Sequence, residues 1–422
     1  MNNLIMLNFS VPKFKLLYAT VLLSILFSCK KNKLEDEPVS PKTGTRTELT
    51  IDSLYLYAKE VYLWNDALPN YSSFDPRNKY NNITPENNAL KKELFDIAQF
   101  KINESTKLPY EFTNYGSPKY SYLEETSKES LKATSNTKKI NKIHVSHIHK
   151  LSYLAIHSFP QLNSIKADLD ETFSEISAQN PSTLVIDLRY NSGGYIETAE
   201  YLANLMAPSY LNGKVIYSEN FNQTLQSGNA KILKNQPYLD NNGNYVNIDG
   251  RQATMADVDY SEKGNTYFFK KQGTLESVKN IYFITSGTTA SASELLISAF
   301  KPYFNVKLVG QKTYGKPVGF FAINIDKYSI YMSSFLIKNA TGWFDYFNGM
   351  EPHITVTLPS KPNLGDPQEP CLKSIISDLA TSAKIMKAGN KLLKEPFISE
   401  KNSSLILKDK GLLLENRLRL KN

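Results

Sequence analysis

Cysteine is almost missing from this chain of 422 residues, which contains only Cys29 and Cys371. At most one disulfide can form, and none can form if either thiol carries another group. The fold must therefore be stabilised by a packed core, for which a hydrophobic content of 41% is sufficient. The length allows two or three domains, and no internal repeat is apparent.

Charge of one sign is only in slight excess. Lys and Arg number 49 against 41 for Asp and Glu, which gives a formal net charge of +8. Residues 1–28 contain Lys13 and Lys15 but no acidic residue, so removing these two charges leaves +6. No clustered basic face with interleaved aromatic residues is visible. The composition therefore indicates a mildly basic solvated surface and no nucleic-acid partner.

A hydrophobic run long enough to span a bilayer comfortably is also missing near the N-terminus. The apolar run Leu16–Phe27 follows two lysines, a pattern typical of an export signal. It ends in Leu-Phe-Ser-Cys29, which resembles the bacterial lipobox, although the bulky Phe27 departs from the commonest form. The resemblance implies that Cys29 receives a lipid. The alternative is an ordinary signal peptide with an incidental cysteine.

These features predict a lipid anchor. We expect a lipoprotein signal peptide over residues 1–28 and a flexible tether over residues 29–48, between the membrane and the folded body. The expected location is the bacterial cell envelope, on the periplasmic side or at the outer-membrane surface. The membrane leaflet and the oligomeric state stay open at this point.

The segment around Ser291 is the first candidate site. The apolar run Ile281–Ile284 is typical of a short buried strand, and an apolar helix is expected to begin near Ser291. A serine at such a turn can expose its hydroxyl beside the unpaired N–H groups of the helix, which suits an oxygen nucleophile. Ser291 and Glu294 also have the spacing of a capping box, in which the serine only caps the helix. On this segment alone, capping is the favoured interpretation.

A second segment reverses that preference. Residues 306–310 predict another strand, and the Gly-Lys-Pro turn after it places Lys316 25 positions beyond Ser291. Together the two segments resemble the carboxyl-terminal processing proteases, also called tail-specific proteases. The resemblance implies that Ser291 is the nucleophile and Lys316 the general base. It also implies an α/β fold with a crotonase-like (ClpP/crotonase-type) protease core.

A glycine-rich block carries a second signature of the family. A buried strand is expected over residues 183–189, and it runs into Tyr190-Asn191-Ser192-Gly193-Gly194. Glycine lets the backbone approach a ligand closely and leaves its N–H groups available. The resemblance implies that the N–H groups of Gly194 and Ala292 form the oxyanion hole. Alone, the block could instead cradle a phosphate, which is the weaker interpretation beside the serine and lysine segments.

The resemblance also organises the chain into domains. Apolar residues at helical spacing predict a helical N-terminal domain over residues 49–108. Many members of the family carry a PDZ domain next, which needs roughly 80 to 100 residues. Only residues 109–142 are available, so we predict a linker in its place, which puts recognition of carboxyl termini in doubt. The protease core is expected over residues 143–370, and a C-terminal helix and tail over residues 371–422.

Three positions depart from the family's pattern. Phe320 stands where many relatives have a glutamine that orients the lysine, and Pro302 where some have an acidic residue. His353 replaces the acid in a Gly-x-x-Pro-Asp sequence. A lysine with a pKa of about 10.4 in water serves as a base near neutral pH only if burial lowers that value. The apolar neighbours of Lys316, among them Phe320, predict such a pocket.

A metal site is the alternative raised by histidine. Three of the 5 histidines, His144, His147 and His149, lie within six residues. No Cys, Asp or Glu is close enough in sequence to complete a tetrahedral set. We expect neither a metal nor an organic cofactor.

The predicted function is that of a membrane-anchored serine endopeptidase that hydrolyses polypeptides, either unfolded or at tail segments, with a Ser/Lys dyad. One alternative is an envelope lipoprotein of the same fold that binds peptides or partners without turnover. Another is a hydrolase of esters or envelope glycans, although the lack of a convincing pair of carboxylates speaks against glycoside chemistry.

Overall fold

The structure, a computed structural model of the whole chain, describes residues 40–125, 143–240, 243–386 and 417–421. The predicted signal peptide and Cys29 lie outside the described residues. Within the described ranges, no helix is both long and apolar enough to cross a membrane.

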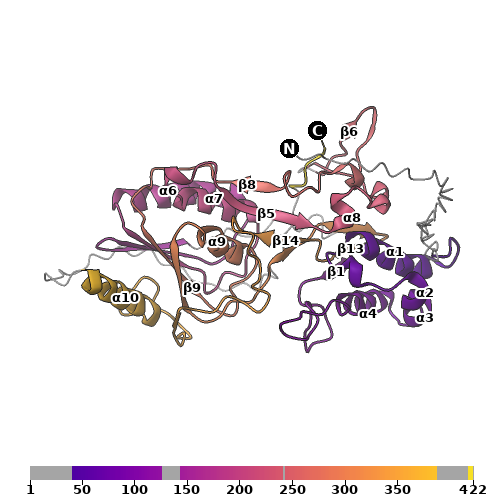
Figure 1. Cartoon of the computed structure of the whole chain (residues 1–422), viewed down its shortest axis with the longest axis horizontal. Helices are drawn as coiled ribbons and strands as arrows, with labels where there is room; N and C mark the ends of the chain where they lie inside the picture. The colour runs from indigo at the N-terminus through magenta and orange to yellow at the C-terminus, as the bar shows by residue number, and fades with distance from the viewer. Residues whose placement is uncertain (1–39, 126–142, 241–242, 387–416, 422) are drawn as a thin grey trace, which may run out of the picture.

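A six-stranded mixed sheet forms the centre of the α/β part (Figure 1). Five neighbouring strands are parallel, and β2 joins antiparallel to β3 at one edge. Parallel neighbours require crossover connections, which the chain makes largely through helices. Across the sheet, the strands are β15 (Ile354–Thr355), β10 (Asn305–Gly310), β9 (Asn280–Thr285), β4 (Thr183–Asp187), β3 (Leu151–Ile156) and β2 (Ile143–Ile148).

Helices cover both faces of this sheet. Alternate residues of a strand point to opposite faces, and Leu184 and Ile186 of β4 belong to the larger hydrophobic core. Val185 between them packs instead in a second cluster with Leu372 and Ile375. The expected α/β class is therefore confirmed, with helices on either side. The larger core takes in α6 (Leu162–Ala178), α7 (Ile196–Met206) and α9 (Ala292–Phe300), and the second cluster takes in α10 (Pro370–Met386).

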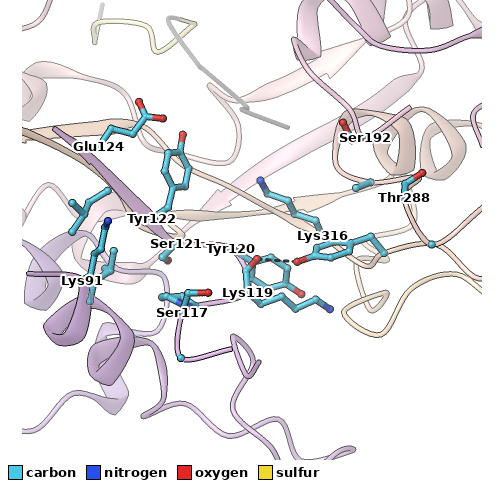
Figure 2. Close-up of a pocket in the computed structure, with 17 residues that line it drawn as sticks. Lys91, Ser117, Lys119, Tyr120, Ser121, Tyr122, Glu124, Ser192, Thr288 and Lys316 are labelled. Atoms are coloured by element: carbon cyan, nitrogen blue, oxygen red, sulfur yellow. Dashed lines mark hydrogen bonds between the residues drawn. The ribbon is translucent and has the colours of Figure 1, made fainter. Parts of the chain in front are cut away.

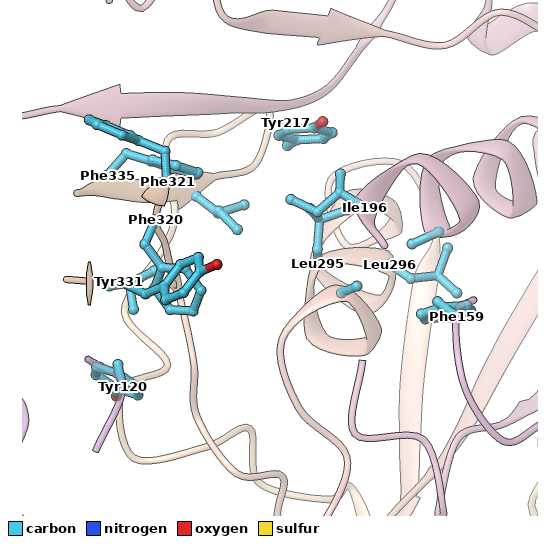
Figure 3. Close-up of a cluster of buried hydrophobic side chains, with 14 of the residues drawn as sticks. Tyr120, Phe159, Ile196, Tyr217, Leu295, Leu296, Phe320, Phe321, Tyr331 and Phe335 are labelled. Atoms are coloured by element: carbon cyan, nitrogen blue, oxygen red, sulfur yellow. The ribbon is translucent and has the colours of Figure 1, made fainter. Parts of the chain in front are cut away.

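Two further antiparallel sheets carry many of the aromatic side chains. Figure 3 shows Phe320, Phe321 and Phe335 on one side of the buried cluster and Leu295 and Leu296 of α9 on the other. This packing fixes the strands that follow the lysine turn relative to the helix that follows the serine. One sheet has the order β11 (Val318–Gly319), β14 (Phe335–Lys338), β5 (Val215–Phe221), β8 (Thr266–Phe268), and the other β1 (Tyr122–Glu125), β13 (Tyr328–Tyr331), β12 (Ala322–Ile325).

The N-terminal part of the described chain is helical. Its first helix begins before residue 49 because Thr45 caps it: the Thr45 hydroxyl accepts the N–H of Glu48, and the Glu48 carboxylate accepts the N–H of Thr45. The helices are α1 (Arg46–Val61), α2 (Tyr71–Phe74), α3 (Pro76–Tyr80) and α4 (Glu86–Ala98).

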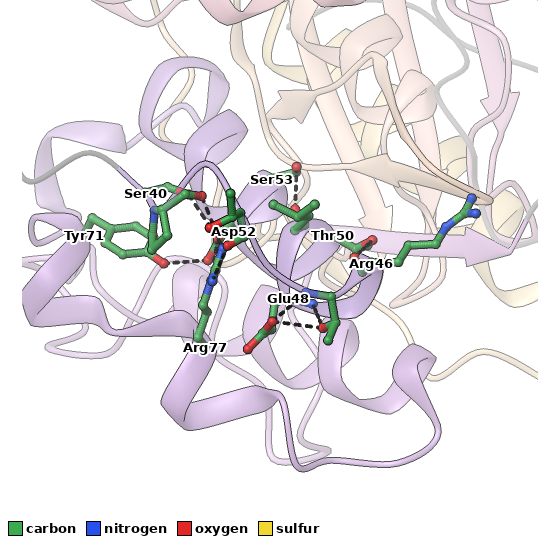
Figure 4. A network of polar contacts seen from close by, with 12 residues as sticks. Ser40, Arg46, Glu48, Thr50, Asp52, Ser53, Tyr71 and Arg77 are labelled. Atoms are coloured by element: carbon green, nitrogen blue, oxygen red, sulfur yellow. Dashed lines mark hydrogen bonds and ion pairs between the residues drawn. The ribbon is translucent and has the colours of Figure 1, made fainter.

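A buried carboxylate joins the first three of these helices (Figure 4). Asp52 of α1 accepts hydrogen bonds from the hydroxyls of Ser40 and Tyr71, at 3.0 and 2.6 Å. It also pairs with the guanidinium of Arg77 at 2.6 Å. Asp52 is 2% exposed, and a buried charge is tolerated only with partners of this kind.

Part of the predicted linker is folded. Within residues 109–142 the structure describes 109–125, and the last four of these form β1, which pairs with β13. This segment therefore adds an edge strand to the three-stranded antiparallel sheet. The domain boundaries themselves stay predictions.

The last described residues return to the body of the chain. Arg417 pairs with Glu200 of α7 at 2.6 Å, and Leu420 forms an isolated bridge with Val258. The region around Val258 consists of loops and short elements. The short elements of the chain are α8 (Gln223–Gln226), β6 (Asn247–Ile248), β7 (Arg251–Gln252) and the 3-10 helices η1 (Asn65–Ala67), η2 (Ser209–Leu211), η3 (Lys231–Asn235) and η4 (Met255–Asp257).

Candidate active site

Ser291 lies at a strained turn between β9 and α9. Its φ and ψ are 59° and −119°, a region that a residue with a Cβ rarely adopts. The side chain is buried, and its hydroxyl has no hydrogen-bond partner among the described residues. The hydroxyl therefore makes no cap bond to the helix. Only the reverse half of the capping box operates, in which the Glu294 carboxylate accepts the N–H of Ser291 at 3.0 Å.

The glycine-rich block meets this turn through its backbone. Gly193 and Gly194 have φ values of 105° and 129°, which favour glycine. A Cβ on Gly193 would lie 2.9 Å from the Cβ of Ser291, and one on Gly194 would lie 2.1 Å from the carbonyl oxygen of Phe159. Asn191 fixes the approach, since its side chain accepts the N–H of Gly193 and its carbonyl accepts the hydroxyl of Ser293. No other residue type fits these two positions without movement.

Two main-chain N–H groups remain available beside Ser291. The bridge between Phe159 and Gly194 uses the N–H of Phe159 and the N–H of Tyr195, so the N–H of Gly194 points away from Phe159. Ala292 is the first residue of α9, where N–H groups have no partner within the helix. Neither N–H donates a hydrogen bond within the described part of the chain. A Cβ on Gly193 would lie 3.1 Å from the Ala292 nitrogen, so the two segments are in contact.

Lys316 lies in the turn between β10 and β11. It is 7% exposed, and its Nζ is 4.4 Å from the centroid of the Phe320 ring. Burial lowers its pKa to about 8, while the carboxylates of Glu111 and Glu294 act in the opposite direction. The expected desolvated pocket is present. A substantial fraction of this lysine is therefore neutral near physiological pH, as a general base requires.

Glu294 connects the serine turn to the lysine turn. Its Oε1 accepts the Thr313 hydroxyl at 2.5 Å and the Gly315 N–H at 2.7 Å. Its Oε2 accepts the N–H groups of Ser291 and Lys316 at 3.0 and 2.8 Å. Burial raises the pKa of this carboxyl, and the four hydrogen bonds oppose that effect. The local sequence indicates only a helix cap at this position, because the three partners other than Ser291 lie 19 to 22 residues away.

The three residues that depart from the family's pattern lie in different parts of the structure. Phe320 presents its ring to the ammonium of Lys316, a cation–π contact in place of an amide. Pro302 follows the C-terminal end of α9, whereas Ser291 is at the opposite end of that helix. The His353 ring accepts the main-chain N–H of Leu308, and the main-chain N–H of His353 donates to the Leu308 carbonyl. These two hydrogen bonds attach His353 to β10.

The histidine cluster has structural partners. The ring of His147 contacts the Ser152 hydroxyl at 2.9 Å and the Glu175 carboxylate at 3.1 Å, and His144 stacks edge-on against Tyr153. Within the described ranges, no group of three or more His, Cys, Asp or Glu side chains could hold a metal ion.

A cavity of about 760 Å³ opens beside the lysine (Figure 2). Figure 2 shows Lys316 between the tyrosine-rich segment that ends in β1 and the side chains of Ser192 and Thr288. The walls come from α4, from residues 116–124 and from the loops around the serine and lysine turns. The lining residues are Lys91, Leu94, every residue from 116 to 124, Ser192, Gly287, Thr288, Ala290, Tyr314 and Lys316.

Comparison with known families gives one match, to a family of peptidases. The sequence model of peptidase family S41 matches residues 150–356, a segment that contains Gly194, Ser291 and Lys316. The predicted family is thereby confirmed.

Several solved structures are similar to the chain. One is named photosystem II D1 C-terminal processing protease, with a TM-score of 0.46 and 14% identity over 78% of this chain and 100% of that one. Another is a lipoprotein from Streptococcus agalactiae, with a TM-score of 0.46 and 15% identity over 82% and 99%. A structure from Bacteroides fragilis assigned to the S41 proteases gives 0.43 and 19% identity over 59% of each chain, so less than two thirds of that relative is spanned. No curated protein gives a significant match.

Proposed function

We propose that this protein is a serine endopeptidase that uses Ser291 as nucleophile and Lys316 as general base. The observation that carries the proposal is the shared carboxylate of Glu294, which binds the main-chain N–H groups of both residues. The unpartnered hydroxyl of Ser291 and the lowered pKa of Lys316 support it. An available hydroxyl and a partly neutral lysine are two of the properties that a Ser/Lys dyad requires.

The first step forms an acyl-enzyme. Neutral Lys316 takes the proton of the Ser291 hydroxyl while the serine oxygen bonds to the carbonyl carbon of the substrate. The negative charge that develops on the carbonyl oxygen is stabilised by the N–H groups of Gly194 and Ala292, each donor worth roughly 3 kcal/mol. The protonated lysine then gives its proton to the leaving amine, and the peptide bond breaks.

The second step returns the enzyme to its starting state. Water takes the place of the amine, Lys316 accepts a proton from it, and the resulting hydroxide attacks the acyl carbon. The same two N–H groups stabilise the second oxyanion. The ester bond to Ser291 then breaks as the lysine returns the proton to the serine oxygen. No metal or cofactor takes part in these steps.

The cavity suits an extended polypeptide. Residues 122–124, which belong to β1, line the cavity that Lys316 also lines. β1 is the edge strand of its three-stranded sheet, with β13 on its inner side. An extended substrate can pair with such an edge whatever its side chains, which is the mode known as β-strand addition.

The anchor and the location are further parts of the proposal. The export pattern of residues 1–28 and the lipobox-like sequence support a lipid on Cys29 and attachment to the cell envelope. Metabolic labelling with a fatty acid tests this. We expect label in the wild type and none in Cys29→Ala, whereas equal labelling would reject the anchor.

Activity is tested on an unfolded protein substrate between pH 6 and 10. We expect wild type to cleave it and Ser291→Ala and Lys316→Ala to lose cleavage while staying folded by circular dichroism. Cleavage by the variants at the wild-type rate would reject the dyad.

A second candidate function is peptide binding without turnover. It is favoured by Phe320, which gives Lys316 a ring face in place of a hydrogen-bonding amide. A folded wild type that binds an unfolded substrate but never cleaves it would establish this alternative.

A further inference from the structure

Glu111 is a fully buried acidic residue in the segment that precedes β1. Its exposure is 0%. The hydroxyls of Tyr62, Ser121 and Ser333 donate to its Oε1 at 3.1, 2.8 and 2.9 Å. The main-chain N–H groups of Tyr120 and Ser121 donate to its Oε2 at 3.2 and 2.7 Å. Five donors therefore converge on one carboxyl group.

This shell of donors indicates that Glu111 is ionised. The oxygen of the Ser121 hydroxyl accepts the N–H of Ser333 at 3.0 Å, which directs the hydroxyl proton to Glu111. Two of the five donors are main-chain N–H groups, which cannot accept a proton, and the Ser121 hydroxyl is oriented to donate, so the shell favours the carboxylate over the acid. Burial raises the pKa of Glu111, and hydrogen bonds from its neighbours oppose that effect. A buried carboxylate of this kind calls for a nearby positive charge.

Hydrogen bonds connect Glu111 to the turn that carries Lys316. Tyr120, whose N–H the carboxylate accepts, donates its own hydroxyl to the carbonyl of Gly315 at 2.7 Å. Gly315 directly precedes Lys316. Tyr120 and Ser121 also line the cavity that Lys316 lines. Glu111 thus holds this wall of the cavity against the turn that carries the lysine.

The charges around Lys316 complete the arrangement. Within the described residues, the carboxylates that act on this lysine are those of Glu111 and Glu294. Glu294 is already bound to four donors from the serine and lysine turns. The other titratable groups that face these carboxylates are the hydroxyls of Tyr62, Tyr120, Tyr314 and Tyr346 and the ammonium of Lys119.

We propose that Glu111 is a positioning residue for the lysine: it holds the wall of the cavity in place, and its charge stabilises the ammonium that Lys316 becomes. This inference rests on the proposed function. The O–H bond of Ser291 breaks as an N–H bond forms on Lys316, and the proton then passes to the leaving amine. Glu111 keeps its negative charge throughout. Glu111 lies outside residues 150–356, the segment that matches family S41.

The test is the pH profile of kcat/KM for wild type and Glu111→Gln. In wild type, kcat/KM should rise with pH as Lys316 loses its proton. Loss of the negative charge lowers the pKa of Lys316, so this rising limb of the profile should move about one unit toward lower pH. The plateau should fall about ten-fold, because a less basic amine is a weaker proton acceptor. Glutamine can keep most of the shell, since its carbonyl accepts the two N–H groups and its NH₂ donates to the hydroxyl oxygens of Tyr62 and Ser333 once these turn.

Glu93→Gln is the matched control. Glu93 is also 0% exposed, and neither of its carboxyl oxygens has a hydrogen-bond partner among the described residues. Burial and the nearby carboxylates of Asp52 and Asp96 raise the pKa of Glu93 well above its ordinary value, so this substitution changes a buried acid to an amide without removing a charge. A general effect of replacing a buried glutamate would appear here too. We expect the rising limb to stay at the wild-type pH.

The outcomes separate this inference from the proposed function. If wild type does not cleave, or Ser291→Ala cleaves equally well, the proposed function fails. If wild type cleaves and folded Glu111→Gln keeps the wild-type inflection, only the role of Glu111 is overturned. Should Glu111→Gln not fold, Glu111→Asp decides: its carboxylate is one methylene shorter, so its inflection should lie below that of wild type. An unmoved inflection would again overturn the role.

Discussion

Ser291 and Lys316 are joined through one oxygen atom. The Oε2 of Glu294 accepts the main-chain N–H of Ser291 at 3.0 Å and that of Lys316 at 2.8 Å. The two turns come from opposite ends of the segment formed by α9 and β10. A single buried carboxylate therefore sets the distance between the proposed nucleophile and the proposed base.

Glu294→Gln should separate the two turns. A glutamine has one acceptor oxygen for four donors, so two buried N–H or O–H groups lose their partner and meet an NH₂ group. We expect a loss of about 3 kcal/mol in the free energy of unfolding, at about 1–3 kcal/mol per unsatisfied group. We also expect a fall of about 100-fold in kcat, because small displacements at a catalytic site have effects of this size. Urea unfolding and steady-state kinetics measure both, and unchanged kcat in a folded variant would reject the joining role.

The lowered pKa of Lys316 predicts how stability depends on pH. The folded pKa is about 8, and an unfolded lysine has about 10.4. Between these values the unfolded state binds more protons, so this residue's contribution to stability rises with pH through that window. Below pH 8, burial of the ammonium lowers the free energy of unfolding by up to about 3 kcal/mol, because each unit of difference between the two pKa values corresponds to about 1.36 kcal/mol.

Lys316→Met removes that cost together with the activity. At pH 7 we expect the variant to unfold at higher urea concentration than wild type, and the difference should shrink from pH 8 to pH 10. Parallel urea curves at several pH values test this. A variant that is less stable than wild type throughout the range would contradict it.

Gly194→Ala should damage the predicted oxyanion hole. Its Cβ would lie 2.1 Å from the Phe159 carbonyl oxygen, so the turn must move and its N–H must leave the site. Loss of one such donor lowers kcat by about 100- to 1,000-fold. Gly213→Ala is the control, because φ is also positive there, at 76°, but nothing lies within 4 Å of the new Cβ. The control should cost about 1 kcal/mol of stability and leave kcat in place; equal losses in both variants would make the effect one of backbone strain.

Arg189→Lys should lower the free energy of unfolding. The guanidinium of Arg189, 2% exposed as a residue, pairs with Asp187 and Glu369 at 2.7 Å each. Lysine cannot reproduce this planar two-sided contact, so we expect a loss of about 3 kcal/mol in thermal or urea unfolding. The exposed pair of Arg251 with Asp257 gives the control, since Arg251→Lys should cost less than about 1 kcal/mol. Similar costs at both sites would show that burial of the pair adds nothing.

Local patterns in the sequence were enough for the main elements of the core. The apolar run Ile281–Ile284 lies within β9, and the helix expected near Ser291 begins at Ala292. These elements follow from side-chain periodicity and from glycine at turns, which act over a few residues. The family signature also depends on short spacings, so the serine, lysine and glycine segments could be recognised together.

Contacts between distant residues could not be read in this way. The predicted linker contains β1, a strand of four residues whose partner β13 lies about 200 positions later, so no nearby pattern marks it. Glu111 looks like an ordinary surface acid in sequence, and only the fold surrounds it with Tyr62, Ser121 and Ser333.

The sequence by itself determined the family, the α/β class and the residues that carry the expected chemistry, because these depend on residue type at short spacing. Only the tertiary structure decided the environment of those residues. It left the Ser291 hydroxyl without a cap bond, buried Lys316 and put two carboxylates around it. The reason is physical: a pKa depends on solvent exclusion and on charges brought close in space, and both arise only when distant segments pack together.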